Sequence, residues 1–255
     1  MIIYFSGCGN SRHVANALGK HLTDPRIAAI EGDILADKNL TATGEKRIVW
    51  VFPVYSWGVP PIVAKFILEA KIEGAESAEH HCVMTCGDDA GLTDSQWRKL
   101  IADRGWRAFS ASSVIMPNTY TLMKGFDVDD EEAAAKKIKE SAERIKEAAG
   151  RIIGGKADSD ICRGKFAWIK SRVIYPWFKR FAMSPKPFHS SEECVGCGLC
   201  AKGCPTRNIT LEPSTRRPIW GNNCALCLRC YHSCPTHAVE YGNATKGKGQ
   251  YLYRP

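Results

Sequence analysis

The sequence predicts an α/β protein in which a doubly wound parallel sheet of five strands is followed by a small, cysteine-rich α+β domain. Three observations support this prediction. Apolar runs alternate with helical stretches along residues 1–150, a glycine-rich loop follows the first apolar run, and eight of the twelve cysteines lie in residues 194–234. Strands that alternate with helices are typical of a parallel sheet with helices on both of its faces.

The expected strands are short apolar runs, and the expected helices are stretches with a 3.6-residue apolar period. The strands are Met1–Phe5, Arg26–Ile30, Arg47–Val54, His80–Cys86 and Arg107–Met116. The helices begin with a segment that opens at Ser11 and continue with Pro61–Ala70, Leu92–Arg104 and Asp129–Ala149. In such a sheet, ligands bind outside the carboxyl ends of the strands, at the switch point of the strand order.

The segment SGCGNS, Ser6 to Ser11, connects the first strand to the first helix. The amides of such a loop and the helix dipole both favour an anion, which suggests a phosphate. A dinucleotide fingerprint would need a third glycine where Arg12 stands, and a Walker loop would need a lysine that this loop lacks. The monoester phosphate of flavin mononucleotide (FMN) fits a loop with hydroxyl donors and no lysine. The residues expected to bind it are Ser6, Gly7, Cys8, Gly9, Asn10 and Ser11.

Two further loops follow the third and fourth strands and should border the flavin ring. The loop PVYSWG offers Tyr55 and Trp57 as stacking faces, and the loop TCGDDAG offers amides for the pyrimidine edge. The residues expected to contact the flavin are Pro53, Val54, Tyr55, Ser56, Trp57, Gly58, Thr85, Cys86, Gly87, Asp88 and Gly91.

The eight clustered cysteines form two copies of the pattern Cys-x2-Cys-x2-Cys-x3-Cys-Pro, offset by 30 residues. In this pattern three thiolates hold one cluster and the fourth holds the other cluster. One [4Fe–4S] cluster is therefore assigned to Cys194, Cys197, Cys200 and Cys234, and the other to Cys224, Cys227, Cys230 and Cys204.

Other uses of these cysteines are disfavoured. Disulfides need an oxidising compartment, and zinc sites usually take separated pairs of ligands. Four ligands for each cluster leave no iron open for radical chemistry, which indicates electron transfer. Residues 186–255 resemble a bacterial two-cluster ferredoxin.

The front half resembles a flavodoxin, with SGCGNS as its phosphate loop, and the whole chain resembles the fused flavodoxin–ferredoxin proteins of anaerobic bacteria. This resemblance implies a flavodoxin-like FMN-binding domain over 1–155, a basic and aromatic connector over 156–186, and a two-[4Fe–4S] ferredoxin domain over 187–255. One departure is Cys8, which stands where flavodoxins usually have threonine, and a thiol is a poorer donor than a hydroxyl.

The charge distribution sets the connector apart. The chain carries a formal net charge of +8, yet residues 1–150 hold 18 basic and 21 acidic residues. Residues 151–191 hold 9 basic and 2 acidic residues, and residues 192–255 hold 8 and 4. The connector also contains several aromatic residues, so three interpretations arise. We favour an interdomain packing element over peripheral membrane contact through 165–181, and nucleic-acid binding is not expected.

Neither a signal peptide nor a membrane-spanning helix is expected. The N-terminus lacks a charged stretch followed by an apolar segment and a cleavage site. The uncharged run 48–64 contains three prolines and Gly58, which would break a membrane helix. We therefore expect a soluble, cytoplasmic protein.

The leading functional hypothesis is a low-potential electron carrier that passes electrons between FMN, two [4Fe–4S] clusters and redox partner proteins, some of them acidic. Two alternatives remain open. One is an FMN-dependent reductase of a small substrate such as a quinone, and the other is a redox-sensing or scaffolding module with an empty flavin site. An electron carrier is favoured over an enzyme with its own substrate.

Overall fold

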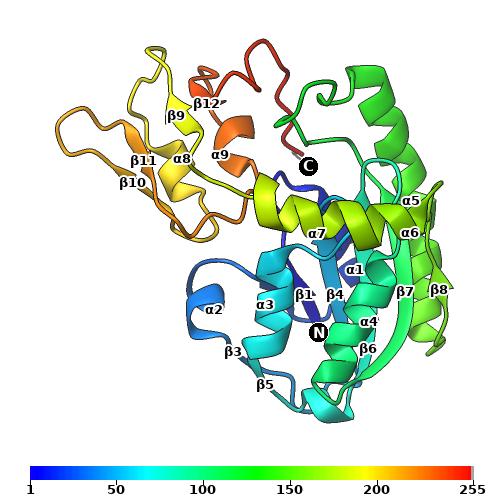
Figure 1. Cartoon of the computed structure of the whole chain (residues 1–255). Helices are drawn as coiled ribbons and strands as arrows, with labels where there is room; N and C mark the ends of the chain where they lie inside the picture. The colour runs from blue at the N-terminus through cyan, green and yellow to red at the C-terminus, as the bar shows by residue number, and fades with distance from the viewer. Residues whose placement is uncertain (254–255) are drawn as a thin grey trace.

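The computed structural model describes residues 1–253, so the last two residues of the expected C-terminal domain lie outside the described part. A parallel sheet covered by helices forms the N-terminal part (Figure 1). Its strands are β1 (Ile2–Tyr4), β2 (Ile27–Ala29), β4 (Arg47–Pro53), β6 (Glu79–Cys86), β7 (Arg107–Ile115) and β8 (Ser159–Asp160). Its helices are α1 (Asn10–His21), α2 (Gly32–Asp37), α3 (Pro61–Glu69), α4 (Thr93–Asp103) and α5 (Glu131–Ile153). A separate pair, β3 (Asn39–Thr41) and β5 (Lys71–Glu73), and a 3₁₀ turn, η1 (Ala75–Ser77), complete this part.

The strand order confirms the predicted fold class. The sheet has the order β2-β1-β4-β6-β7-β8, and every neighbouring pair is parallel. Numbered within the sheet, its first five strands follow the order 2-1-3-4-5, which is the flavodoxin-like arrangement. The chain adds β2 on one side of β1 and then crosses over to add β4, β6 and β7 on the other side. The carboxyl ends of β1 and β4 therefore form the switch point of the strand order.

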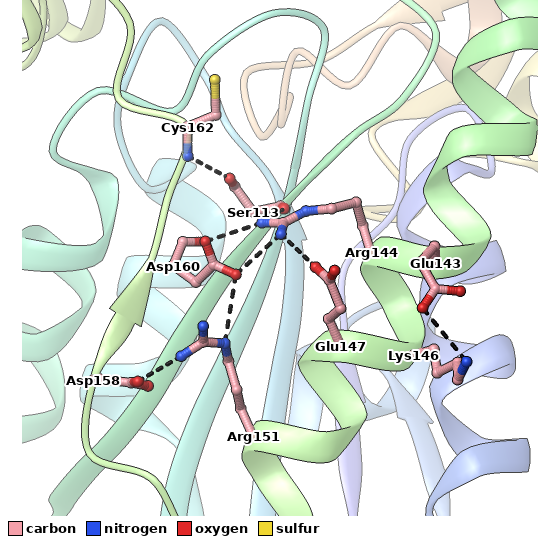
Figure 2. A network of polar contacts seen from close by, with 9 residues as sticks. All are labelled: Ser113, Glu143, Arg144, Lys146, Glu147, Arg151, Asp158, Asp160 and Cys162. Carbon is pink, nitrogen blue, oxygen red and sulfur yellow. Dashed lines mark hydrogen bonds and ion pairs between the residues drawn. The ribbon is translucent and has the colours of Figure 1, made fainter.

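The sheet has six strands rather than the predicted five, because β8 adds a short parallel edge to β7. Figure 2 shows how α5 fixes this edge. Arg144 Nη1 lies 3.0 Å from Asp160 Oδ2, and Arg151 Nη1 lies 2.5 Å from Asp158 Oδ2. Each such exposed pair contributes about 0–1 kcal/mol, but here they form one network. A two-residue strand held by charges on the preceding helix has no apolar pattern by which the sequence could reveal it.

Successive side chains of the central strands point to opposite faces of the sheet, and apolar side chains on both faces form two hydrophobic cores. In β4, Trp50 and Phe52 point to the face covered by α3 and α4, whereas Val49 and Val51 point to the face covered by α1 and α5. All four side chains are buried. A parallel strand that is apolar on both faces needs helices on both faces, which is why the helices divide into two layers.

Residues 167–182 form one continuous helical segment, which we call the connector helix. It comprises α6 (Ala167–Ile169), the π-helical turn η2 (Lys170–Ile174), α7 (Tyr175–Trp177) and the π-helical turn η3 (Phe178–Ala182). Figure 1 shows it crossing the sheet domain from the side of β8 toward the C-terminal domain.

One face of the connector helix is bonded to the loops that follow β4 and β6. Ser171 Oγ accepts the amide of Leu92 at 2.8 Å and donates to the Trp57 carbonyl at 2.8 Å. The Tyr175 hydroxyl donates to the Val59 carbonyl. The connector helix is therefore part of the sheet domain rather than a free linker.

The C-terminal domain consists of two antiparallel two-stranded sheets and two short helices. Its elements are β9 (Phe188–Ser190) paired with β12 (Val239–Tyr241), β10 (Ile209–Leu211) paired with β11 (Pro218–Trp220), α8 (Leu199–Lys202) and α9 (Arg229–His232). The helices start 30 residues apart, the same offset that separates the two cysteine patterns. Its small core includes Cys8 from the sheet domain, so the two domains share an apolar interface.

His80 is a buried, uncharged member of the sheet domain. Its Nδ1 accepts the indole N–H of Trp50 at 3.0 Å, and its Nε2 donates to the Ala75 carbonyl at 2.9 Å. Burial lowers the pKa of His80 from 6.5 to about 4. The neighbouring His81 has its pKa lowered to about 4 by burial as well.

Acidification should therefore destabilise the sheet domain. Between pH 6.5 and about pH 4, His80 binds a proton more strongly in the unfolded chain than in the folded one. The folding stability that neutral His80 allows at neutral pH is therefore lost as the pH falls through this range. We expect His80 to account for about 2 kcal/mol of lost stability between about pH 7 and pH 5. The His80→Gln variant keeps a donor and an acceptor but cannot titrate. Urea unfolding across this range should show a shallower pH dependence in that variant, and an unchanged slope would contradict the assignment.

Candidate cofactor sites

A cavity opens at the carboxyl ends of β1, β4, β6 and β7, and we call it the switch-point cavity. It brings together parts of all three loops that the sequence analysis selected. Its lining consists of Ser6, Gly7, Cys8, Asn10, Ser11, Pro53, Val54, Tyr55, Thr85, Cys86, Gly87, Met116, Pro117, Asn118, Thr119, Tyr120 and Cys227. Neither lysine nor arginine is among these residues.

The phosphate loop presents amides and hydroxyls to this cavity. Gly9 is the N-cap of α1 with φ +100°, and its amide donates to Ser6 Oγ at 3.2 Å. Asn10 and Ser11 lie in the first helical turn, where amides have no intrahelical acceptor. The hydroxyls of Ser11 and Thr85 are 2.8 Å apart. An uncharged set of donors at a helix N-terminus fits a monoester phosphate.

A buried acceptor in the same cavity also fits a ligand with hydroxyl or N–H groups. Asn10 Nδ2 donates to the Pro117 carbonyl at 2.9 Å, which fixes the orientation of the amide. Its Oδ1 is buried and has no hydrogen-bond partner among residues 1–253. Buried acceptors are nearly always paired, so a ligand donor is the natural partner of this oxygen.

Six of the expected flavin contacts do not line the cavity: Gly9, Ser56, Trp57, Gly58, Asp88 and Gly91. Trp57 was expected to stack on the ring, but it faces the connector helix. Lys170 Nζ lies 4.9 Å from the centroid of its ring.

A tight turn explains the orientation of Trp57. Tyr55 and Gly58 exchange two backbone hydrogen bonds of 2.9 and 3.0 Å. The two central residues, Ser56 and Trp57, have φ values of +45° and +62°, as in a type I′ turn. This turn leaves Tyr55 at the cavity and carries the next residues away from it.

The second half of the loop after β6 also faces the connector. Asp89 forms an ion pair with Lys170 at 2.5 Å, and Arg163 donates to the Gly91 carbonyl at 3.2 Å. The Asp88 carbonyl lies 3.6 Å from the Cys162 sulfur. Asp88 and Gly91 therefore belong to the contact with the connector.

The cavity lining also includes Met116–Tyr120, which follows β7, and Cys227 from the C-terminal domain, none of which the sequence pattern indicated. The first could have been found, because β7 is parallel to its neighbours and ends at the same edge. Tyr120 is a second aromatic residue in the lining of the cavity, in addition to Tyr55. Nothing local in the sequence marks Cys227 as a cavity residue, since only the packing of the two domains brings it there.

The C-terminal cysteines surround two small cavities. The first cysteine set consists of Cys194, Cys197, Cys200 and Cys234, and the second consists of Cys204, Cys224, Cys227 and Cys230. The spacing assigned the same cysteines to two crossed ligand sets, and that each set holds a cluster stays a prediction. Within residues 1–253, no three His, Cys, Asp or Glu side chains are placed to hold a single metal ion.

The surroundings of the sulfurs fit a cluster that supplies positive charge. Burial raises the pKa of Cys224 to about 12, and Cys227 and Cys204 add to this effect. Thiolates at such positions need nearby iron to stay deprotonated. The backbone amide of Asn208 donates to the sulfur of Cys204 at 3.3 Å, and the amide of Ala238 donates to the sulfur of Cys234 at the same distance. Such N–H···S bonds influence the reduction potential of iron–sulfur clusters.

The second cysteine set lies against the phosphate loop. The Cys8 sulfur is 3.6 Å from the Cys227 carbonyl, so the thiol faces the C-terminal domain. Burial raises the pKa of Cys8, and Cys227 adds to the increase. A Cβ atom on Gly7 would lie only 2.3 Å from the same carbonyl. The close approach of the two domains therefore requires glycine at position 7.

Comparison with known proteins agrees with the assignment of the cysteines. A family model described as a 4Fe-4S dicluster domain matches residues 193–238. The C-terminal part of the chain is a small ferredoxin-like 4Fe-4S domain. The formate dehydrogenase-O iron-sulfur subunit of Escherichia coli (strain K12) is 36% identical over 61 residues, covering 20% of this chain and 19% of that protein. The formate dehydrogenase iron-sulfur subunit of Haemophilus influenzae is 31% identical over 67 residues, 23% of this chain and 20% of that protein. The chain thus spans about a fifth of the length of these curated relatives.

Solved structures similar to the sheet domain include two flavodoxins. That of Streptococcus pneumonia TIGR4 is 13% identical, with a TM-score of 0.40, over 60% of this chain and 96% of that chain. A Fusobacterium nucleatum flavodoxin bound to flavin mononucleotide is 10% identical, with a TM-score of 0.37, over 60% of this chain and 95% of that chain. The fold assignment of the sheet domain depends on its strand order, described above.

The Gly7→Ala substitution should weaken the packing of the dicluster domain on the phosphate loop. The added methyl group meets a backbone carbonyl that cannot rotate away, and overpacking of this kind costs about 1–3 kcal/mol. Gly150→Ala is the matched control, because a Cβ atom there meets nothing within 4 Å. We expect urea unfolding to show a loss of stability for Gly7→Ala and no loss for Gly150→Ala. Equal stability of the two variants would contradict the close contact.

Proposed function

We propose that this chain is an electron-transfer protein that binds FMN in the switch-point cavity and one [4Fe–4S] cluster in each cysteine set. A flavin accepts one or two electrons and a cluster accepts one, so the chain would convert between paired and single electron transfer. The match to a dicluster domain and the flavodoxin-like fold support this general function. The identity of the flavin and the presence of two clusters belong to the proposal.

The observation that carries the proposal is the position of Cys227. This cysteine belongs to the second set and also lines the switch-point cavity. A cluster in the second set would therefore lie directly beside the flavin. Electron tunnelling slows steeply with distance, so adjacent placement of two redox groups is what an internal electron path requires.

The first cysteine set is suited to exchange with a partner protein. Cys197 is exposed, and its neighbours Val195 and Leu199 are 69% and 47% exposed. Arg216 lines the same cavity and is exposed. We infer the order flavin, second set, first set, partner, with an acidic partner surface facing Arg216.

Anaerobic purification followed by cofactor analysis tests the proposal. We expect one FMN, about eight iron atoms and about eight acid-labile sulfides per chain. A chain without flavin would support the scaffolding alternative instead. A chain with FAD, or with iron for one cluster only, would also overturn the assignment.

The repeat offers a matched pair of variants for the crossed ligand sets. Cys204→Ala should disrupt the cluster bound by Cys224, Cys227 and Cys230, and it should slow electron exchange with the flavin. Cys234→Ala, the equivalent position in the second pattern, should disrupt the other cluster and leave that exchange fast. Electron paramagnetic resonance and stopped-flow reduction would report the two effects. Loss of the cluster at Cys194 in the Cys204→Ala variant would contradict the crossed arrangement.

A further inference from the structure

The connector helix has two faces of different character. Ser171, Tyr175 and Phe178 are buried against the sheet domain. The outer face carries large apolar side chains at a four-residue spacing, namely Ile169, Val173, Trp177 and Phe181, which are 47%, 54%, 53% and 66% exposed. Phe166 and Trp168, at the start of the helix, are 73% and 63% exposed. A contiguous exposed apolar face of this kind marks an interaction site.

The same segment is strongly and uniformly basic. Residues 161–191 contain seven lysines and arginines and neither aspartate nor glutamate. Lys170 and Arg163 form ion pairs with Asp89 and Asp94 of the sheet domain. Arg172 and Arg180 are exposed and form no ion pair within the described residues. The outer face therefore combines apolar side chains with uncompensated positive charge.

We propose that the outer face of the connector helix binds peripherally to an anionic lipid surface. Helices of this composition lie in the plane of the interface, with aromatic and aliphatic side chains in the acyl boundary and basic ones at the headgroups. Each nearby lysine or arginine adds attraction to anionic lipid. None of the helices within residues 1–253 is long and apolar enough to cross a bilayer, so this contact is with the surface of the membrane.

Charge and side-chain chemistry favour lipid over other occupants. A second copy of the chain would place one basic face against another, which is repulsive. A nucleic acid would satisfy the arginines but would leave Ile169 and Val173 without apolar surroundings. An anionic bilayer accommodates both kinds of side chain at once.

Vesicle flotation with the complete, cofactor-loaded chain tests the proposal. The probes are phosphatidylcholine vesicles with and without phosphatidylglycerol. We expect binding to the anionic vesicles to be at least about tenfold stronger, and to weaken as salt is added.

Two double variants examine the apolar and the basic components separately. Trp177→Ser with Phe181→Ser should reduce binding at least about tenfold by removing two aromatic anchors. Arg172→Gln with Arg180→Gln should reduce it about tenfold at low salt. Ile153→Ser is the apolar control because Ile153 is 54% exposed on α5, and Lys20→Gln with Lys246→Gln is the charge control. Both controls should bind like the unmodified chain, and the visible absorption spectrum of each variant reports intact folding.

Three results would overturn the proposal. The unmodified chain could fail to bind anionic vesicles, or the Trp177→Ser, Phe181→Ser variant could bind as well as its controls. The third result has three parts. Light scattering shows that the unmodified chain is a dimer without lipid, the Trp177→Ser, Phe181→Ser variant is a monomer, and the unmodified chain does not bind vesicles. That outcome would assign the outer face to a second copy of the chain.

Discussion

The guanidinium of Arg229 fixes the dicluster domain on the phosphate loop, and both cofactor sites depend on it. It donates to the carbonyls of Gly7 at 2.9 Å, Ser6 at 2.6 Å and Gly203 at 2.8 Å, and it forms an ion pair with Glu31 at 2.8 Å. A planar group with five N–H donors can make all these contacts at once, whereas a lysine cannot. In a trans peptide the carbonyl and the amide point in opposite directions. By holding the carbonyls of Ser6 and Gly7, Arg229 fixes the orientation of the two peptide planes that also contain the amides of Gly7 and Cys8.

The position of this arginine also matters electrostatically. It lies between Cys227 and Cys230 in the sequence and contacts the phosphate loop, so it separates two sites that are expected to hold anions. An oxidised cluster with four thiolates carries a charge of about −2. Burial lowers the pKa of Arg229, but Glu31 and Cys227 outweigh burial and leave the pKa above its ordinary value. A permanent positive charge at this point reduces the repulsion between a cluster and a phosphate, which allows the two domains to approach closely.

The parts of the fold and of the sites that depend on local sequence patterns could be predicted. The parts that depend on contacts between residues far apart in the chain could not. The strand order follows from apolar runs that alternate with helices, and the two cysteine sets follow from a repeat with identical spacing. Trp57 was misplaced because Ser56 and Trp57 adopt positive φ without glycine at either position, which no turn signal indicates. Cys227 was not expected at the switch-point cavity because its position there requires a contact between residues 220 apart in the chain, such as the one between its carbonyl and Gly7.

The turn that contains Trp57 links the wall of the cavity to the connector helix. Positive φ is strained for a bulky residue, so the surroundings must hold the turn in place. Ser171 supplies this restraint through its hydrogen bond to the Trp57 carbonyl, and Lys170 covers the indole ring. Tyr55, which lines the cavity, is only two residues away in the same turn. The shape of the cavity on this side therefore depends on where the connector helix sits, and the outer face of that helix is the part of the molecule most suited to contact a lipid surface.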